Sequence, residues 1–204
     1  MEGVSRRQLL VAASATTAVG AIAAAPGTAS ARGRAGDGGG PVLPPTPDTY
    51  RFPLASTTPQ IVRPGGSITK AGPDNFPVLK DNQVSVAYLV LKKGALREPH
   101  WHPTHWEVDY AVQGTGELGI VTPDDQQSIS VLNPGDIGFV PQGWAHYIRN
   151  VGNSDLIWVL VFNNPLSDIG LSTMFGGMPT STFTQTLGVP ITGAAKPQET
   201  LFIV

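Results

Sequence analysis

The residues best suited to chemistry in this chain are its histidines, because three of the four stand close together. His100, His102 and His105 fall within six residues, and His146 comes later. Residues i and i+2 of a β-strand point to the same face, so His100 and His102 can direct two imidazole rings to one point. Glu107 follows after a short bend and can add a carboxylate. This spacing indicates a site that collects nitrogen and oxygen donors.

A single histidine inside a β-fold is commonly just a hydrogen-bonded core residue. Burying several polar groups together, however, costs several kcal/mol unless something satisfies them, and a divalent cation does so directly. The chain has no cysteine, which excludes disulfides and thiolate ligands. We therefore predict a metal site with only nitrogen and oxygen donors, made by His100, His102, Glu107 and His146.

Short apolar runs that alternate with turn residues predict the elements that must position these side chains. The run at 84–91 has its valine and tyrosine positions at period two, which is typical of a β-strand. Similar runs follow at 106–112, 117–121, 128–132, 135–140, 146–151 and 156–162. Many short strands at close spacing indicate an all-β fold, either a barrel or a jelly roll.

Two further elements are expected near the C-terminus. One helix should run from about Pro179 to Leu187, with Thr180 near its start and Gly188 as its stop. The tail after Pro190 should be extended. Its apolar end at 201–204 should pack either on the β-fold or on a neighbouring subunit.

The N-terminal part of the chain predicts export. Arg6 and Arg7 precede an apolar, alanine-rich stretch, and small residues at 29–31 offer a cleavage site. Paired arginines are typical of a twin-arginine signal, and an ordinary secretory signal is the alternative. The stretch is short and weakly hydrophobic for a membrane span. We expect a secreted or extracytoplasmic protein organised as an export signal (1–31), a disordered Gly/Pro-rich spacer (32–48) and one domain (49–204).

Composition narrows the class of partner. Charged residues make up 14 % of the chain and the net charge is −2, which lacks the basic footprint of a nucleic-acid-binding protein. No run of charge indicates a membrane surface. We therefore expect a small-molecule partner, with no nucleic acid and, for the mature form, no membrane.

The spacing around the histidines resembles both sequence motifs of the cupin superfamily. The resemblance implies a double-stranded β-helix, which is a jelly-roll barrel, with a short C-terminal helix, and it makes a homo-oligomer the expected assembly. The motif glycines permit tight turns where strands fold back. Every defining position is present, namely Gly94, His100, His102, Glu107 and Gly114 in the first motif and Gly135, Pro141, Gly143, His146 and Asn150 in the second.

The segment from Gly94 to Pro103 is similar to the site strand of the bicupin oxalate decarboxylases. The similarity includes the arginine three residues before the first ligand, here Arg97, and it extends from about Tyr50 to Gly188. Those enzymes carry two cupin domains, whereas this chain has one. Plant germins, with one cupin per chain, indicate that this size can support oxalate oxidation.

The resemblance implies that the predicted site binds manganese with two open coordination positions. Iron, zinc, nickel and copper remain alternatives, because all accept nitrogen and oxygen ligands. Arg97 would hold the substrate carboxylate with its planar guanidinium; the alternative is a surface arginine paired with Glu98. His105 is not a family ligand position and would lie beside the ligands or on the surface. The four tryptophans would line the pocket or pack in the core.

The reaction implied by the family depends on one proton donor. Manganese and dioxygen draw an electron and a proton from oxalate, the C–C bond breaks, and carbon dioxide leaves. A placed acid then yields formate, whereas its absence yields a second carbon dioxide and hydrogen peroxide. One family position for that acid corresponds to Leu160, which cannot donate. The other lies in a lid loop and corresponds to Asp168, whose alternative role is to cap the loop.

These considerations predict a metal-dependent oxalate decarboxylase with Arg97 and Asp168 as its catalytic residues and Arg97 as the substrate-binding residue. Oxalate oxidase is the alternative reaction, and dioxygen would be a cofactor or co-substrate of either. A cupin dioxygenase or isomerase acting on another acid stays open. An alternative of another class is a non-catalytic cupin that binds a metal or a small acid.

Overall fold

The computed structural model describes residues 48–189 and 203–204. The expected export signal, nearly all of the expected spacer and most of the expected tail therefore lie outside the described residues. No helix within the described part of the chain is both long and apolar enough to cross a membrane.

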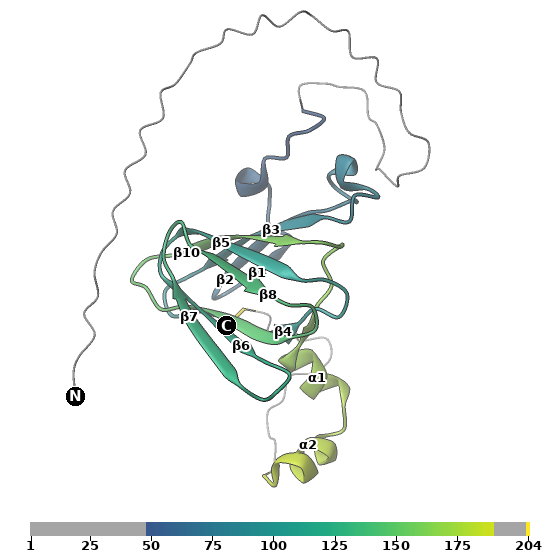
Figure 1. Ribbon diagram of the computed structural model, residues 1–204, viewed down its shortest axis with the longest axis vertical. Coiled ribbons are helices and arrows are strands. Elements are labelled where there is room, and N and C mark those ends of the chain that lie inside the picture. The colour runs from purple at the N-terminus through teal and green to yellow at the C-terminus, as the bar shows by residue number, and fades with distance from the viewer. Residues whose placement is uncertain (1–47, 190–202) are drawn as a thin grey trace, which may run out of the picture. The chain divides into compact units, whose positions relative to one another are not determined.

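The described strands form two antiparallel sheets (Figure 1). The first sheet contains, in spatial order, β1 (Ile61–Arg63), β2 (Gly66–Ala71), β3 (Ser85–Leu91), β10 (Leu156–Phe162), β5 (Glu107–Gln113) and β8 (Ile137–Val140). The second contains β11 (Ile169–Gly170), β4 (Leu96–Trp101), β9 (Ala145–Asn150), β6 (Gly116–Val121) and β7 (Gln127–Leu132). The all-β jelly-roll prediction is confirmed, although as two separate sheets; no closed barrel is found among these strands.

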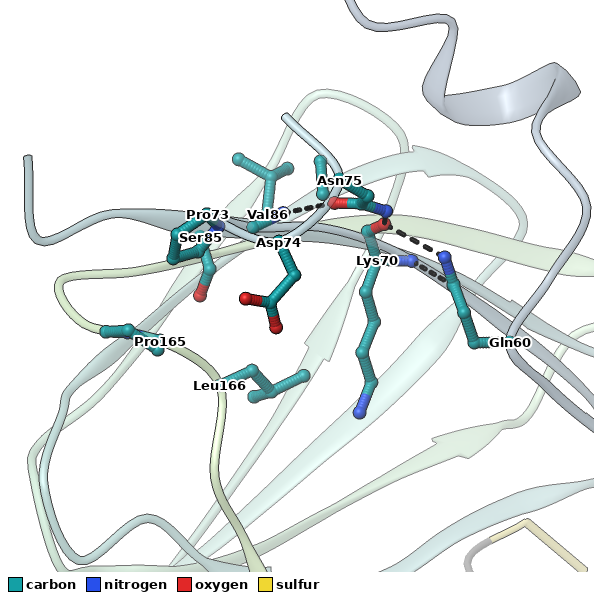
Figure 2. Close-up of a pocket in the computed structure, with 11 residues that line it drawn as sticks. Gln60, Lys70, Pro73, Asp74, Asn75, Ser85, Val86, Pro165 and Leu166 are labelled. Atoms are coloured by element: carbon teal, nitrogen blue, oxygen red, sulfur yellow. Dashed lines mark hydrogen bonds between the residues drawn. The ribbon is translucent and has the colours of Figure 1, made fainter. Parts of the chain in front are cut away.

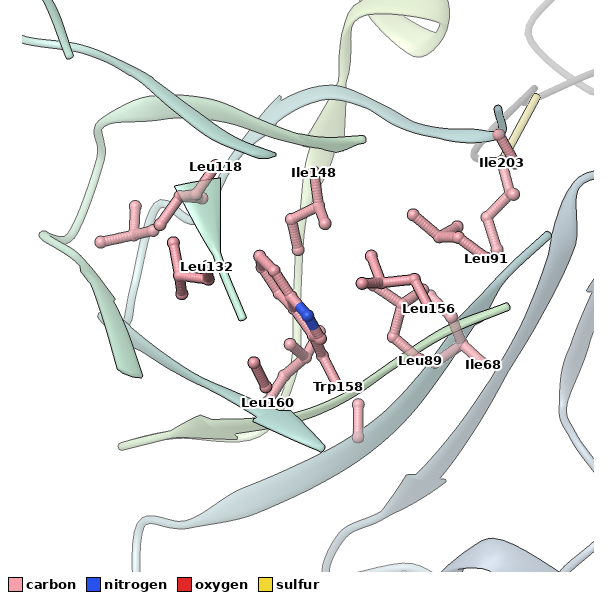
Figure 3. Packing of buried hydrophobic residues seen from close by; sticks show 14 of the residues in the cluster. Ile68, Leu89, Leu91, Leu118, Leu132, Ile148, Leu156, Trp158, Leu160 and Ile203 are labelled. Atoms are coloured by element: carbon pink, nitrogen blue, oxygen red, sulfur yellow. The ribbon is translucent and has the colours of Figure 1, made fainter. Parts of the chain in front are cut away.

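The hydrophobic core lies between the two sheets and follows from alternation along the strands. Every second residue of β3 and β10 is buried, because successive side chains of a strand point to opposite faces. Leu89 and Trp158 face each other in the pairing of these strands and are fully buried. Figure 3 shows Trp158 surrounded by leucines and isoleucines from both sheets, including Leu118 and Ile148 of the second sheet.

The helices only partly match the prediction. The expected helix is present as α2 (Thr180–Leu187), and it ends at Gly188 with a left-handed φ of 69°. A second helix, α1 (Leu171–Gly177), was not predicted. Short 3-10 turns occur at η1 (Leu54–Ser56) and η2 (Pro77–Leu79). The predicted strand at 135–140 begins two residues later than expected, at Ile137.

The end of the chain returns to the core. Ile203 is buried among the core side chains, and Val204 exchanges two backbone hydrogen bonds with Leu96, of 2.7 and 2.9 Å. Of the two expected packing partners for the tail, the β-fold is therefore the one observed for these residues.

Candidate metal centre

Four side chains, three on strands and one just after a strand, converge at one end of the space between the sheets. His100 on β4 pairs with His146 on β9, His102 follows β4, and Glu107 begins β5 in the opposite sheet. One ligand atom from each of these four residues lies within 4.8 Å of the others. All four side chains are buried, at most 3 % exposed. The structure thus brings together every residue of the predicted metal site.

The turn before β9 ties the two motif segments to each other. Gly143 has a left-handed φ of 80°, a conformation that glycine adopts without steric cost. Its backbone N–H donates to the His102 carbonyl at 2.9 Å. This bond fixes His102 against the loop that leads into His146.

The three imidazole rings are oriented by backbone carbonyls. The Nδ1 atoms of His100, His102 and His146 lie 2.8, 2.9 and 3.0 Å from the carbonyl oxygens of Glu98, Ser167 and Trp144, respectively. A carbonyl oxygen can only accept, so each Nδ1 carries the proton and donates it. The Nε2 atom of each ring is then left with a free lone pair, which is the arrangement that a metal ligand needs.

The donor atoms fit a cation and little else. The Nε2 atoms of His102 and His146 lie 2.7 and 3.1 Å from Oε2 of Glu107. Three acceptors meeting without a cation between them would repel one another. The second carboxylate oxygen, Oε1, is buried, and the carboxyl group of Asp109 lies beside the same carboxylate. A divalent ion would satisfy these atoms together, as nitrogen and oxygen ligands do for manganese, iron or zinc.

The charge states also suit a metal site. Burial alone would raise the pKa of Glu107, but its contacts with His102 and His146 outweigh burial and hold that pKa well below its ordinary value, which requires positive charge on the Nε2 side of these rings, as a bound cation would supply. Burial, and then the charge of Arg97, lowers the pKa of His100 well below its ordinary value. An ionised carboxylate and a neutral imidazole are the forms that bind metal ions.

Arg97 reaches the same interior because the β4–β9 pairing is irregular. On a regular strand, residues three positions apart point to opposite faces. The register of the pairing shifts between Arg97 and His100, so both of these residues face the interior. Arg97 is 3 % exposed, and its Nη2 donates to the carboxylate of Asp168. The alternative of a surface arginine is therefore wrong.

Glu98 instead holds the start of α1. Its two carboxylate oxygens accept from the backbone N–H and the hydroxyl of Ser172, each at 2.8 Å. A Cβ atom on Gly170 would lie 2.5 Å from Oε1 of Glu98, so this close approach requires glycine. The contact anchors the chain just after Asp168. No side chain of its own segment caps α1, and the Asp168 carboxylate faces the interior.

A small cavity adjoins three of the four donor residues, His100, His102 and Glu107. Arg97, Asp168, Leu160, Phe162 and Leu166 line it together with three of the metal-site residues. Its volume is about 10 Å³, close to the minimum that one water molecule needs. Leu160 lies in the wall, as its predicted position requires, and contributes no acid there.

His105 and Asp109 complete the surroundings of the donors. His105 is fully buried and its ring lies 4.4 Å from that of His102, so it is placed beside the ligands and not on the surface; burial lowers its pKa to about 4. Asp109 was missed by the sequence reasoning, although it shares the inward face of β5 with Glu107. Burial, and then the Glu107 charge, raises the pKa of Asp109 well above its ordinary value.

Comparison with known proteins agrees with this geometry. The family model described as cupin matches residues 52–189. Oxalate decarboxylase OxdC of Bacillus subtilis (strain 168) is 32 % identical over 142 residues, covering 69 % of this chain and 35 % of that protein. Germin-like protein subfamily T member 2 of Arabidopsis thaliana is 31 % identical over 130 residues, covering 63 % of this chain and 57 % of that protein. The chain spans about a third of the length of the curated oxalate decarboxylases that it matches.

The solved structures that superimpose on this chain include oxalate decarboxylases. An oxalate decarboxylase structure concerned with substrate binding and a reaction specificity switch superimposes with a TM-score of 0.69 at 25 % identity, covering 75 % of this chain and 40 % of that chain. A structure concerned with the Mn(II) centres of Bacillus subtilis oxalate decarboxylase superimposes with a TM-score of 0.67. Because the family model covers well over half of the chain, this protein belongs to the cupin family.

Proposed function

We propose that this cupin is a manganese-dependent enzyme that cleaves oxalate to formate and carbon dioxide. The observation that carries the proposal is the buried Arg97 guanidinium, which lines the same cavity as His100, His102 and Glu107. A guanidinium can hold a carboxylate with two charge-assisted hydrogen bonds. Oxalate is two joined carboxylates, so one can bind Arg97 while the other reaches the metal.

The Arg97–Asp168 ion pair occupies the place where that carboxylate would bind. The cavity, at about 10 Å³, is too small to admit oxalate while the pair is closed. Substrate binding therefore requires Asp168 to leave Arg97 and the segment that carries it to shift. Such loop movements near active sites commonly admit substrate and then exclude water.

Each residue around the metal-site cavity would have a separate role in the reaction. Bound manganese, with dioxygen, would supply the one-electron oxidation that weakens the C–C bond of oxalate. Arg97 would orient the substrate and balance its charge, and the side chains of Leu160, Phe162 and Leu166 would keep water from the reacting carbon. Asp168 would deliver the proton that, together with the return of the electron withdrawn at the start, converts the remaining one-carbon fragment to formate.

Oxalate oxidation is the second candidate, and two observations favour it. Leu160 leaves one wall of the cavity without a proton donor, and among the relatives are germin-like proteins, one of which the chain covers over 57 % of its length. If Asp168 fails to deliver the proton, the products become carbon dioxide and hydrogen peroxide.

A product assay decides between these functions. Oxalate is added to the manganese-loaded protein in oxygenated buffer, and formate and peroxide are measured. Formate in excess supports decarboxylation, and peroxide in excess supports oxidation. Neither product, with oxalate bound in a calorimetric titration, identifies a non-catalytic binding cupin instead. Elemental analysis of the unstripped protein tests manganese against iron, zinc, nickel and copper.

We also propose that residues 1–31 direct export by the twin-arginine route. Replacing Arg6 and Arg7 with lysine together should leave the protein inside the cell, because that signal depends on its paired arginines. Fractionation of a bacterial host that expresses the full chain, with and without the double substitution, measures this. Equal export of both forms would support an ordinary secretory signal.

A further inference from the structure

A second, larger pocket opens next to the candidate metal centre. Its volume is about 360 Å³, against about 10 Å³ for the metal-site cavity. The walls come from β2, the turn after β2, the start of β3 and the segment after β10 (Figure 2). We call it the outer pocket. The residues that line it include Gln60, Lys70, Asp74, Asn75 and Leu166.

Lys70 contributes the positive charge to the outer pocket. It lies on β2 two residues after Ile68, and Ile68 lines the metal-site cavity. Residues two apart on a strand share a face, so Lys70 continues the inward face of β2 from the inner cavity to the outer pocket. Its side chain is half-buried and extends away from the strand in Figure 2.

Lys70 is paired with Ala87 of β3, and side chains also bind its backbone N–H and carbonyl groups. The Gln60 amide pairs with it twice, accepting from the Lys70 N–H at 2.7 Å and donating to the Lys70 carbonyl at 3.2 Å. The Asn75 amide donates to the same carbonyl at 2.8 Å. These bonds are drawn in Figure 2. They fix the point from which the ammonium group reaches into the pocket.

Leu166 lines both the outer pocket and the metal-site cavity, so it is part of the wall between them. The same segment carries Asp168, which pairs with Arg97 on the inner side. Burial lowers the pKa of Lys70; the charge of Asp168 raises this pKa, and the charge of Arg97 lowers it by a smaller amount. Both cations, Lys70 of the outer pocket and Arg97 of the metal-site cavity, thus lie close enough to Asp168 for its charge to raise their pKa values.

We propose that the outer pocket is an entry site for small carboxylate anions, in which Lys70 captures the substrate before it passes Leu166 and replaces Asp168 on Arg97. This inference rests on the function proposed above and deepens it, because it assigns a substrate-binding residue outside the metal-site cavity. The size difference between the two cavities supports it. A small acid fits the outer pocket at once but fits the inner one only after the wall moves.

Asp74 allows the role of charge in the outer pocket to be tested in the opposite direction. Its carboxylate also lies in the outer pocket, but it is exposed to solvent whereas Lys70 is half-buried. A negative charge there opposes the entry of an anion, and solvent weakens that repulsion. Removing Lys70 and removing Asp74 should therefore change substrate affinity in opposite directions, with the larger effect for Lys70.

The test uses the manganese-loaded full chain and oxalate as the probe. Lys70→Met should raise KM about tenfold, as expected for loss of one charge-assisted contact, with kcat and the formate-to-peroxide ratio unchanged. Lys70→Arg should restore most of the affinity. Asp74→Asn should lower KM by about twofold. The KM difference between wild type and Lys70→Met should shrink as salt is added.

Lys93→Met is the matched control, because it removes the same charge from an exposed position in the turn after β3. Its KM should equal that of the wild type. Calorimetric titration of oxalate into the same four variants and the wild type gives a readout independent of turnover. Circular dichroism checks that each variant is folded.

The outcomes separate this proposal from the proposed function. Turnover of oxalate with the same KM and the same salt dependence in Lys70→Met and Lys93→Met would overturn the entry site and leave the enzyme standing. Oxalate binding that is weakened only by Lys70→Met, without turnover, would overturn the enzyme and leave the entry site standing. A wild type that neither binds nor converts oxalate would overturn both.

Discussion

The two ends of the space between the sheets are built by the same strands but hold opposite chemistry. On β9, His146 points into the metal centre, and Ile148, two residues later, belongs to the hydrophobic core at the point where that core meets the metal-site cavity. On β10, Phe162 lines the metal-site cavity, whereas Trp158 is fully buried in the apolar cluster. The strand alternation that turns these side chains inward is identical at both ends.

This difference shows that strand alternation determines which side chains face inward. It does not determine whether burying them stabilises or destabilises the fold. At the apolar end, burying each large side chain stabilises the fold by about 1.5–3 kcal/mol. At the metal end, burying histidines and a carboxylate is unfavourable until a cation satisfies them. Stability is therefore expected to come from one end, and chemistry from the other.

The strongest way to test this division is to remove a ligand. His146→Ala should reduce manganese affinity by more than about a hundredfold, since loss of an outer partner of a ligand alone costs about 10–100-fold. Oxalate turnover should fall with it. In the absence of metal, the free energy of unfolding should change by less than about 1 kcal/mol. Elemental analysis and urea unfolding with and without manganese measure the two effects.

The matched substitution on the same strand should do the reverse. Ile148→Ala creates a cavity between the sheets and should cost about 2–5 kcal/mol of unfolding free energy. The folded variant should still bind manganese with all four donors in place. If Ile148→Ala lost the metal while His146→Ala lost the stability, the division between the two ends would be wrong.

The sequence predicted the metal end well, because its information is local. His100, His102 and Glu107 lie within eight residues of one another, so the single connection from β4 to β5 is enough to bring them together, and the structure places them within 4.8 Å of one another. The pattern of short strands was likewise sufficient for the all-β fold. The burial of His105 could not be predicted from the sequence, because this residue lies between two strands.

What the sequence did not predict depends on contacts between distant segments. Helix α1 begins where Glu98, 74 positions earlier in the chain, accepts two hydrogen bonds from Ser172, and no local capping signal marks that start. The family resemblance predicted that Arg97 lies in the site, but strand alternation alone would not, because its inward direction depends on the register shift in the β4–β9 pairing. Lys70 and Asp109 were overlooked because a charged residue on a strand gains meaning only once its burial is known.

Within the metal end, Asp168 tests whether the interior wall supplies a proton. Asp168→Asn keeps the shape of the side chain but removes its acid, so formate production should fall by about a hundredfold and the ratio of peroxide to formate should rise. Manganese content should stay unchanged, because Asp168 is not one of the four converging donors. A variant with the wild-type product ratio would exclude Asp168 as the proton donor.

The smallest effect is expected outside the interior, where polar groups need no metal. On the outer face of the second sheet, the Tyr147 hydroxyl donates to Glu117 at 2.8 Å, and Arg149 binds the same carboxylate. The hydrogen bond from Tyr147 is the largest of the causes that lower the pKa of Glu117. Tyr147→Phe should therefore cost about 1 kcal/mol of unfolding free energy at neutral pH.

The pH dependence of that cost distinguishes the hydrogen bond from simple packing. A carboxyl group whose pKa is lowered by folding adds stability above its ordinary pKa, and this stability is lost as the pH falls through the lowered value. The gap between wild type and Tyr147→Phe should thus be constant from neutral pH down to the ordinary carboxyl range and should narrow below it. Urea unfolding over that range measures the gap. A gap that stays constant into acid would mean that the ring packing, and not the bond to Glu117, holds this outer pair together.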